Sequence, residues 1–231
     1  MIDNRFFCPI IELFHRCCPR HRIGRPQGGF LFVAKVTGLL KRISVYIDGF
    51  NLFHAIKDLE DDGLKWVNLW RLSEQLVRGN ENVTVVKYFS AYAKWRETSY
   101  RRHQRYVHHL ENVGVRFIEG NFKRKRQRCR LCNRTFVLHE EKETDVNIGA
   151  HLLADACRDR FDRALIVSAD SDLNQAVVLA RNETSSKLID IVAPPGRKNM
   201  NSRALFEITT GKLRNSLFPD TIANYIELGR R

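Results

Sequence analysis

The sequence is poor in the residues and patterns that mark disordered, disulfide-bonded and membrane-spanning proteins. Only 6 of its 231 residues are proline and 43% are hydrophobic, which argues for a folded core. Six cysteines are too few for a disulfide framework in a chain of this length, so we expect reduced thiols. No apolar run approaches the roughly 20 residues that span a bilayer. The apolar stretch at 30–34 is interrupted by Lys35 and begins far from Met1, which argues against a secretory signal. We therefore expect a cytoplasmic globular protein.

Positive charge is what the sequence has in excess. Lysine and arginine number 39 against 26 acidic residues, which gives a net charge of +13 and an isoelectric point near 9.8. Such a surplus favours an anionic partner, nucleic acid first and an anionic membrane surface second. Together with the acidic residues described below, it favours nucleic acid and no membrane.

Short apolar runs that suit strands alternate from residue 41 onward with stretches of helical period. The predicted strands are 43–47, 82–90, 115–118, 164–167, 188–192 and a short one at 204–208, and the predicted helices are 52–59, 66–77, 98–113, 146–157 and 173–181. Strands that are apolar on both faces and separated by helices indicate a mainly parallel sheet in an α/β fold.

The chain divides by composition into one domain with appendages. We expect residues 1–40 to form a basic, poorly ordered N-terminal extension, with a basic arm that contacts nucleic acid as the alternative. The domain itself is expected at 41–222, with a small basic hairpin inserted at about 121–140. Residues 223–231 are expected to form a C-terminal tail.

Four aspartates stand where an apolar element meets a loop. Asp48 follows one predicted strand, Asp170 and Asp172 follow another, and Asp145 opens a predicted helix. The carboxyl ends of parallel strands meet at one edge of a sheet, where ligands bind. Converging carboxylates repel one another unless a cation lies among them. Helix capping alone is the other explanation for each aspartate. Asn51, one turn after Asp48, would face the same pocket or act as a cap.

These residues carry a resemblance to a known family. Tyr46–Leu52, Lys142–Val146 and Val167–Leu173 look like the three signature segments of NYN domains, in the LabA-like branch of the PIN-like nuclease superfamily. Ala193–Arg197 is also similar to that branch. The resemblance covers about residues 41–222 and implies a PIN-like α/β/α sandwich that cleaves RNA with Mg²⁺ or Mn²⁺.

The resemblance also implies roles for individual residues. Asp48, Asp145 and Asp170 would hold the metal, and Asp172 would be an additional acidic residue. Asn51 would orient the site. Ser168 would line it and contact the substrate, next to Ala169, where glycine is frequent in the branch.

Basic residues are candidates for binding the substrate backbone. Candidate contacts are Arg101 and Arg105 in the predicted helix 98–113, Lys123, Arg124, Lys125 and Arg126 in the predicted hairpin, and Lys142 before the helix at 146. Aromatic residues interleave with the basic ones near the start of that helix, and such a mixture suits single-stranded nucleic acid. A solvated basic face is the alternative interpretation.

Cys129 and Cys132 form a CxxC pair inside the hairpin, half of the ligands of a zinc site. The candidate third and fourth ligands are His139, His103, His108 and His109, or residues of a second subunit in a homodimer.

Two functions follow from the residues. The first is a metal-dependent endoribonuclease that acts on single-stranded RNA through an aspartate-rich Mg²⁺ or Mn²⁺ site. The second is a nucleic-acid-binding regulatory module with little or no catalysis. The sequence has no GxxxxGK[ST] or GxGxxG loop, which counts against a phosphotransferase that uses a nucleotide.

Overall fold

The computed structural model describes residues 40–184, 186–198 and 203–229, all within a compact unit that spans residues 39–231. The extension predicted for residues 1–40 lies outside the described residues, apart from Leu40.

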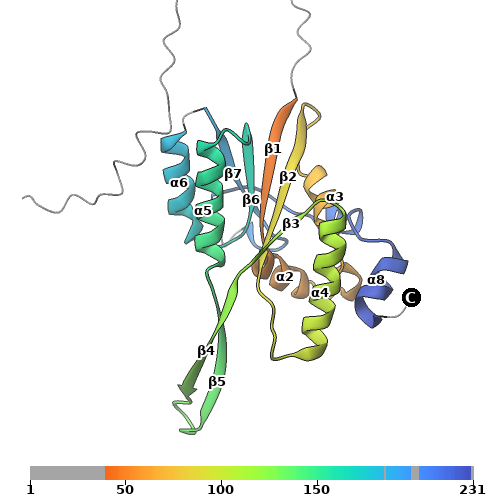
Figure 1. Cartoon of the computed structure of the whole chain (residues 1–231), viewed down its shortest axis with the longest axis vertical. Coiled ribbons are helices and arrows are strands. Elements are labelled where there is room, and N and C mark those ends of the chain that lie inside the picture. The colour runs from red at the N-terminus through yellow and green to blue at the C-terminus, as the bar shows by residue number, and fades with distance from the viewer. Residues whose placement is uncertain (1–39, 185, 199–202, 230–231) are drawn as a thin grey trace, which may run out of the picture. The chain divides into compact units, whose positions relative to one another are not determined.

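A six-stranded sheet forms the centre of the unit, with the strand order β3-β2-β1-β6-β7-β8 (Figure 1). Its strands are β1 (Lys41–Asp48), β2 (Glu81–Ser90), β3 (Arg116–Glu119), β6 (Arg163–Val167), β7 (Leu188–Ala193) and β8 (Ala204–Glu207). All neighbouring pairs are parallel. The strand order reverses between β1 and β6. The predicted parallel α/β sheet is therefore confirmed.

Two helical layers cover the sheet. The helical segments are α2 (Gly49–Lys57), the 3-10 turn η1 (Asp62–Leu64), α3 (Leu69–Glu74), α4 (Glu97–Asn112), α5 (Thr144–Cys157), α6 (Leu173–Glu183), α7 (Thr210–Arg214) and α8 (Asp220–Leu228). Residues of β1 alternate between two hydrophobic cores, Val45 facing one and Tyr46 the other. Helices α5 and α6 contribute to the Tyr46 core, and α2, α3, α4, α7 and α8 to the Val45 core. The result is an α/β/α sandwich.

Two predicted boundaries need correction. Residues 223–231 were expected to be a tail, but α8 packs against α4 with Ile226 fully buried. The predicted helix at 66–77 is the shorter α3, because the Asn68 side chain caps it and accepts the N–H of Arg71. None of the described helices has the length and apolar character needed to cross a bilayer.

The predicted hairpin insertion is present between β3 and α5. Its strands are β4 (Asn121–Arg128) and β5 (Thr135–Lys142), which pair antiparallel in a separate two-stranded sheet. It projects from the end of the domain where the strands of the main sheet terminate (Figure 1). The second strand runs to Lys142, three residues beyond its predicted end at His139.

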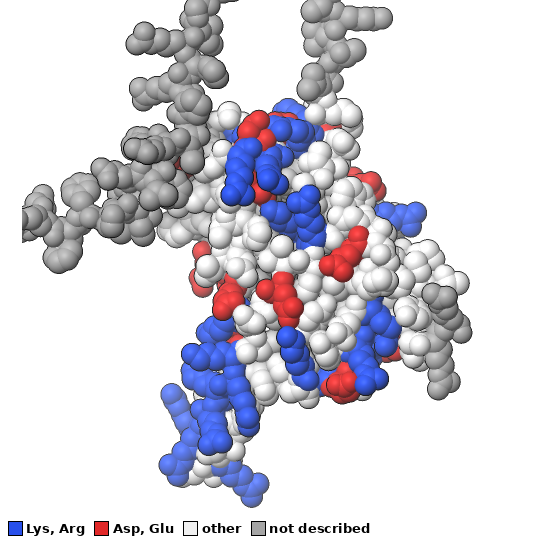
Figure 2. All heavy atoms as spheres, in the orientation of Figure 1, with Lys and Arg blue, Asp and Glu red and all other residues white. Residues whose placement is uncertain are grey.

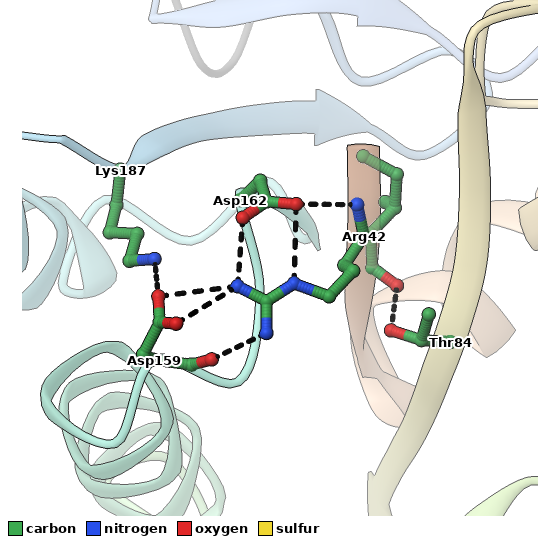
Figure 3. A network of polar contacts seen from close by, with 6 residues as sticks. Arg42, Thr84, Asp159, Asp162 and Lys187 are labelled. Carbon is green, nitrogen blue, oxygen red and sulfur yellow. Dashed lines mark hydrogen bonds and ion pairs between the residues drawn. The ribbon is translucent and has the colours of Figure 1, made fainter. Parts of the chain in front are cut away.

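Ion pairs connect neighbouring segments at the amino-terminal end of the sheet, opposite to the end from which the hairpin projects. The guanidinium of Arg42 at the start of β1 donates to Asp162 before β6 (2.8 Å) and to the carbonyl of Asp159 after α5 (2.7 Å), as Figure 3 shows. Lys187, just before β7, also pairs with Asp159. Arg42, Asp159 and Asp162 are partly exposed, so each pair that Arg42 makes adds little stability.

Arg163 at the start of β6 is a different case, because its side chain is only 4% exposed. It donates to Glu81 of β2 (2.9 Å) and to Asp190 of β7 (2.8 Å), and thereby joins three strands. The Glu81 side chain is equally buried. A buried carboxylate that loses its cation is strongly destabilising.

We expect Arg163→Ala to lower the free energy of unfolding by about 3–5 kcal/mol, because Glu81 is left charged, buried and unpaired. Arg42→Ala, which removes a partly exposed cation at the same end of the sheet, should cost about 1 kcal/mol or less. Urea unfolding followed by circular dichroism measures both. Equal small losses would show that the buried pair contributes no more than the exposed one.

A candidate acidic active site

A pocket of about 540 Å³ opens at the carboxyl end of the sheet, beside the reversal of strand order between β1 and β6. Such reversals are where open α/β sheets bind ligands. The charged residues that line it are Asp48, Glu141, Glu143, Asp145 and Asp170, with Lys142 and Arg197 as the cations. The pocket is therefore acidic, although the protein is strongly basic.

Asp48 is the most buried carboxylate of the pocket, at 4% exposure. Its Oδ1 accepts the N–H of Asn51 (3.0 Å) and so caps α2, and its Oδ2 accepts the hydroxyl of Ser168 (3.0 Å). Helix α2 begins directly at the end of β1 because residue 49 is glycine. A Cβ there would lie 2.5 Å from the Tyr88 ring.

The loop after β6 is held by the same two partners. The side-chain oxygen of Asn51 accepts the N–H of Ala169 (3.1 Å), and the hydroxyl oxygen of Ser168 accepts the N–H of Asp170 (3.0 Å). The orienting role expected of Asn51 fits these contacts. Ser168 is 1% exposed and does not line the pocket, contrary to expectation. Its hydroxyl instead joins Asp48 to the Asp170 loop.

Glu141 is a pocket residue that the sequence did not single out. It lies in β5 opposite Phe122. Helix α5 begins only at Thr144, after Glu143 in a left-handed conformation (φ 79°). The alternation of β5, continued two residues past its predicted end, is the signal that would have placed Glu141 in the hairpin. Asp145 lies in the first turn of α5 and lines the pocket, as expected.

Burial first, and then mutual repulsion, raise the pKa of the pocket carboxyls. Burial is the main cause for Asp48, with the charges of Asp145 and Asp170 adding to it, and its pKa rises to about 6. Burial and the charges of Asp48 and Asp145 raise the pKa of Glu141 to about 7. The pKa of Asp145 is raised by burial, then by Asp170 and Asp172. These carboxyls are thus close enough to interact, and a bound cation would relieve the repulsion.

The carboxylates of the pocket suit a hard cation, although they do not form a complete coordination sphere. Carboxylate oxygens are the ligands that Mg²⁺ and Mn²⁺ prefer. Within the described ranges, no three His, Cys, Asp or Glu side chains stand together as a ready set of metal ligands. Mg²⁺ commonly keeps several waters and uses only one or two carboxylates. The chemistry of the residues therefore fits the ion without a preformed set of three protein ligands.

Other predicted site residues lie outside the pocket or form ion pairs with neighbouring residues of the protein. Asp172 is exposed and lines a neighbouring groove between α5 and α6. Lys142 lines the pocket and pairs with Glu140 (3.2 Å). Arg101 pairs with Glu97 one turn earlier in α4.

Arg105 was expected in the substrate track, but its guanidinium donates to the carbonyls of Ile226 (2.9 Å) and Glu227 (3.2 Å) at the end of α8. These two contacts attach α8 to α4, which is a structural role.

Cys129 and Cys132 lie at the tip of the hairpin, between β4 and β5. Backbone N–H groups of Cys132 and Leu131 lower the pKa of Cys129 by donating to it. A thiolate at this position is what zinc requires. His139 lies in the middle of β5, away from the tip, and is stacked on Trp95 (3.7 Å between ring centroids).

The other three candidate histidines, His103, His108 and His109, belong to α4. Burial lowers the pKa of His103 to about 4, and its ring packs against Tyr92. In the part of the chain that the structure describes, no histidine joins the two cysteines. Further ligands would come from a second copy of the chain.

The sheet, its two helical layers and the acidic pocket at the reversal of strand order define a PIN-like α/β/α sandwich, the fold of a nuclease superfamily. The family model described as "NYN domain" matches residues 42–209, and the chain belongs to this family. The resemblance of the three sequence segments is thereby confirmed.

Two individual proteins are similar to the chain. One is 6-hydroxy-3-succinoylpyridine 3-monooxygenase HspA of Pseudomonas putida (strain DSM 28022 / S16), 24% identical over 196 residues, which cover 70% of this chain and 62% of that protein. The chain thus spans less than two thirds of that relative. The other is the crystal structure of VPA0982, a protein of unknown function from Vibrio parahaemolyticus RIMD 2210633. It has a TM-score of 0.54 and 15% identity, and the match covers 79% of this chain and 99% of that one. It supports the fold alone.

Asp48→Asn should make the protein's stability less dependent on pH. The raised pKa of Asp48, about 6 in the folded protein against about 4 unfolded, means that the folded state holds more protons between these values. Its contribution to stability is therefore full below pH 4 and is lost as pH rises through 6. Asparagine keeps the oxygen that caps α2 and cannot ionise.

The melting temperature, measured from pH 4 to 8 in EDTA, should rise in the variant relative to the native protein between pH 4 and pH 6, and the difference should stay constant at higher pH. Asp220→Asn, at an exposed carboxylate at the start of α8 and away from the pocket, is the control and should follow the native profile. Parallel profiles for all three proteins would contradict the burial cost assigned to Asp48.

A zinc site at the hairpin tip, if a second copy completes it, would have a defined stoichiometry. Four thiolates from two copies would bind one zinc ion per two chains. Elemental analysis of the protein purified without chelator should find that ratio, and Cys129→Ser/Cys132→Ser should abolish it. Cys157→Ser, at an exposed cysteine in α5, should retain the metal. Absence of zinc from the native protein would contradict this prediction.

Proposed function

We propose that the protein is a divalent-metal-dependent endoribonuclease whose preferred substrate is single-stranded RNA. The observation that carries the proposal is the shared pocket of Asp48, Asp145 and Asp170, one from each signature segment, at the reversal of strand order. Membership of the NYN family, and so of a nuclease fold, supports the same conclusion. The net charge of +13 suits a polyanionic substrate.

Asp48, Asp145 and Asp170 would hold the Mg²⁺ or Mn²⁺ ion. A bound ion supplies an activated water and neutralises charge on the phosphate during hydrolysis. Ser168 and Asn51 act indirectly, because their hydrogen bonds position Asp48 and the Asp170 loop. Lys142 and Arg197 line the pocket and would contact phosphate oxygens.

Glu141 would move the proton. Its pKa of about 7 is close to the value at which a general acid or base works best near neutral pH. The Thr144 hydroxyl donates to its Oε1 and orients the carboxyl group, while the residue lines the pocket. It would accept a proton from the attacking water or return one to the leaving oxygen.

One observation favours the alternative, a binding module without catalysis. No ready set of three metal ligands stands among the described residues. However, a protein that only binds RNA gains nothing from five carboxylates in one pocket, since they repel phosphate. We therefore place the nuclease first.

The activity named for the Pseudomonas relative, a monooxygenase, is not proposed for this chain. The identity is 24%, and the pocket is lined largely by charged groups, whereas sites for small organic ligands are mostly apolar.

Incubation of the purified protein with labelled single-stranded RNA tests the proposal. We expect cleavage with Mn²⁺ or Mg²⁺ and none in EDTA. Asp170→Asn should reduce the rate by more than the roughly 10–100-fold that follows loss of an outer-shell partner of a metal. Asp172→Asn, two residues away and outside the pocket, should have a much smaller effect.

Cleavage that survives both EDTA and Asp170→Asn would come from another site or a contaminant. Binding without cleavage under every ion tested would establish the module instead.

A further inference from the structure

The hairpin has two chemically different faces. In β4, Arg124, Arg126 and Arg128 alternate with Lys123 and Lys125, so arginines and lysines point to opposite sides. Register extends the difference to β5. Arg124 lies opposite His139 and Arg126 opposite Val137, whereas Lys123 lies opposite Glu140. Figure 2 shows lysine and arginine gathered over the projecting hairpin as a whole. We call the two sides the arginine face and the lysine face.

The lysine face is partly neutralised by its own acidic residue. Glu140 pairs with Lys142, and its pKa is lowered by Lys142 first and then by Lys125 and Lys123. On the arginine face, Arg124 and Arg126 have no ion-pair partner within the described ranges. Arg128 donates to the backbone carbonyl of Asn133. The arginine face therefore presents the freer positive charge.

An aromatic anchor fixes the base of the arginine face beside the pocket. Phe122, which shares that face, packs against Phe50 of α2 (5.4 Å between ring centroids) and Trp95 before α4 (4.7 Å). His139 of the same face stacks on Trp95. Phe50 also lines the pocket, and Glu141, the next residue of the face toward the base, does too. Arginines, aromatic side chains and pocket thus follow one another along one side of the hairpin.

We propose that a single strand of RNA lies along the arginine face and passes the aromatic anchor into the acidic pocket. Arg124, Arg126 and Arg128 bind successive backbone phosphates, because alternate residues of a strand are about 6.7 Å apart, a spacing that suits an extended chain of nucleotides. Trp95, 41% exposed, offers a surface on which a base stacks. This inference rests on the proposed function only for the strand's end point, since the face binds RNA whether or not cleavage follows.

Two features favour a single strand over a duplex. The major groove of an RNA duplex is deep and narrow, so side chains of a hairpin do not reach into it. A duplex also keeps its bases stacked inside and away from Trp95. The major groove of DNA does admit a two-stranded ribbon, so duplex DNA is the competitor that an experiment must include.

Paired substitutions on the two faces test the proposal. Arg124→Ala/Arg126→Ala and Lys123→Ala/Lys125→Ala remove the same charge from the same part of β4 and differ only in face. Binding of a fluorescent single-stranded RNA is followed by anisotropy in EDTA, at salt concentrations from 50 to 300 mM. We expect the arginine variant to lose affinity roughly 10-fold. Its slope of log K against log salt should fall by about 1.4, because each phosphate contact contributes about 0.7.

The lysine variant should keep the native slope. Equal effects of both variants would overturn the proposal in favour of a diffuse basic surface. Tighter binding of duplex DNA than of single-stranded RNA, with the loss confined to the arginine variant, would also overturn it. Because EDTA prevents metal-dependent cleavage, failure of this binding pattern is distinguishable from failure of the nuclease. Circular dichroism of both variants confirms that the hairpin change leaves the domain folded.

Discussion

The burial of one carboxylate, Asp48, is the constraint on which the site depends. It lies at the end of a central strand, where burial and two neighbouring aspartates oppose its ionisation. Hydrogen bonds from Asn51 and Ser168 offset part of that cost, and the same two residues fix the start of α2 and the loop that carries Asp170. The groups that make a buried acid tolerable are therefore the groups that set the geometry of the pocket. A change at the start of α2 or in the loop after β6 would therefore disturb both the environment of Asp48 and the geometry of the pocket.

Charge is divided sharply over the molecule. The pocket carries five carboxylates against two cations, while the chain as a whole has a net charge of +13. A polyanion is attracted to the basic hairpin and repelled at the pocket unless a cation is bound there. If the protein has the proposed function, the basic hairpin attracts the RNA and the acidic pocket carries out the hydrolysis. Salt would weaken the first steeply, because exposed charges are screened, and would affect the buried carboxylates much less.

The fold and the central acidic residues could be predicted from the sequence because both are local signals. No knowledge of tertiary contacts is needed to recognise the apolar strands, the aspartates that follow them or the family segments. Glu141 was missed because its place depends on the pairing of β5 with β4, and on a left-handed residue at 143. Arg105 and Ser168 were assigned to the substrate because nothing local reveals that α8 or Asp48 occupies their polar groups. Partners distant in sequence decided each of these cases.

The register of the hairpin joins the two surfaces. Strand β5 carries Glu141 at the pocket and, on the same side, residues opposite the arginines. A slip of β5 by one residue relative to β4 would turn the side chains of β5 to the other face, taking Glu141 out of the pocket and placing Glu140 on the side of the arginines. At the tip, the N–H of Cys129 donates to the carbonyl of Arg134 and the N–H of Asn133 donates to the carbonyl of Cys129, and this turn fixes the pairing of the two strands. The aromatic contacts of Phe122 and His139 at the base fix how the paired hairpin lies against the domain. The aromatic anchor therefore aligns the arginine face with the acidic residues of the pocket.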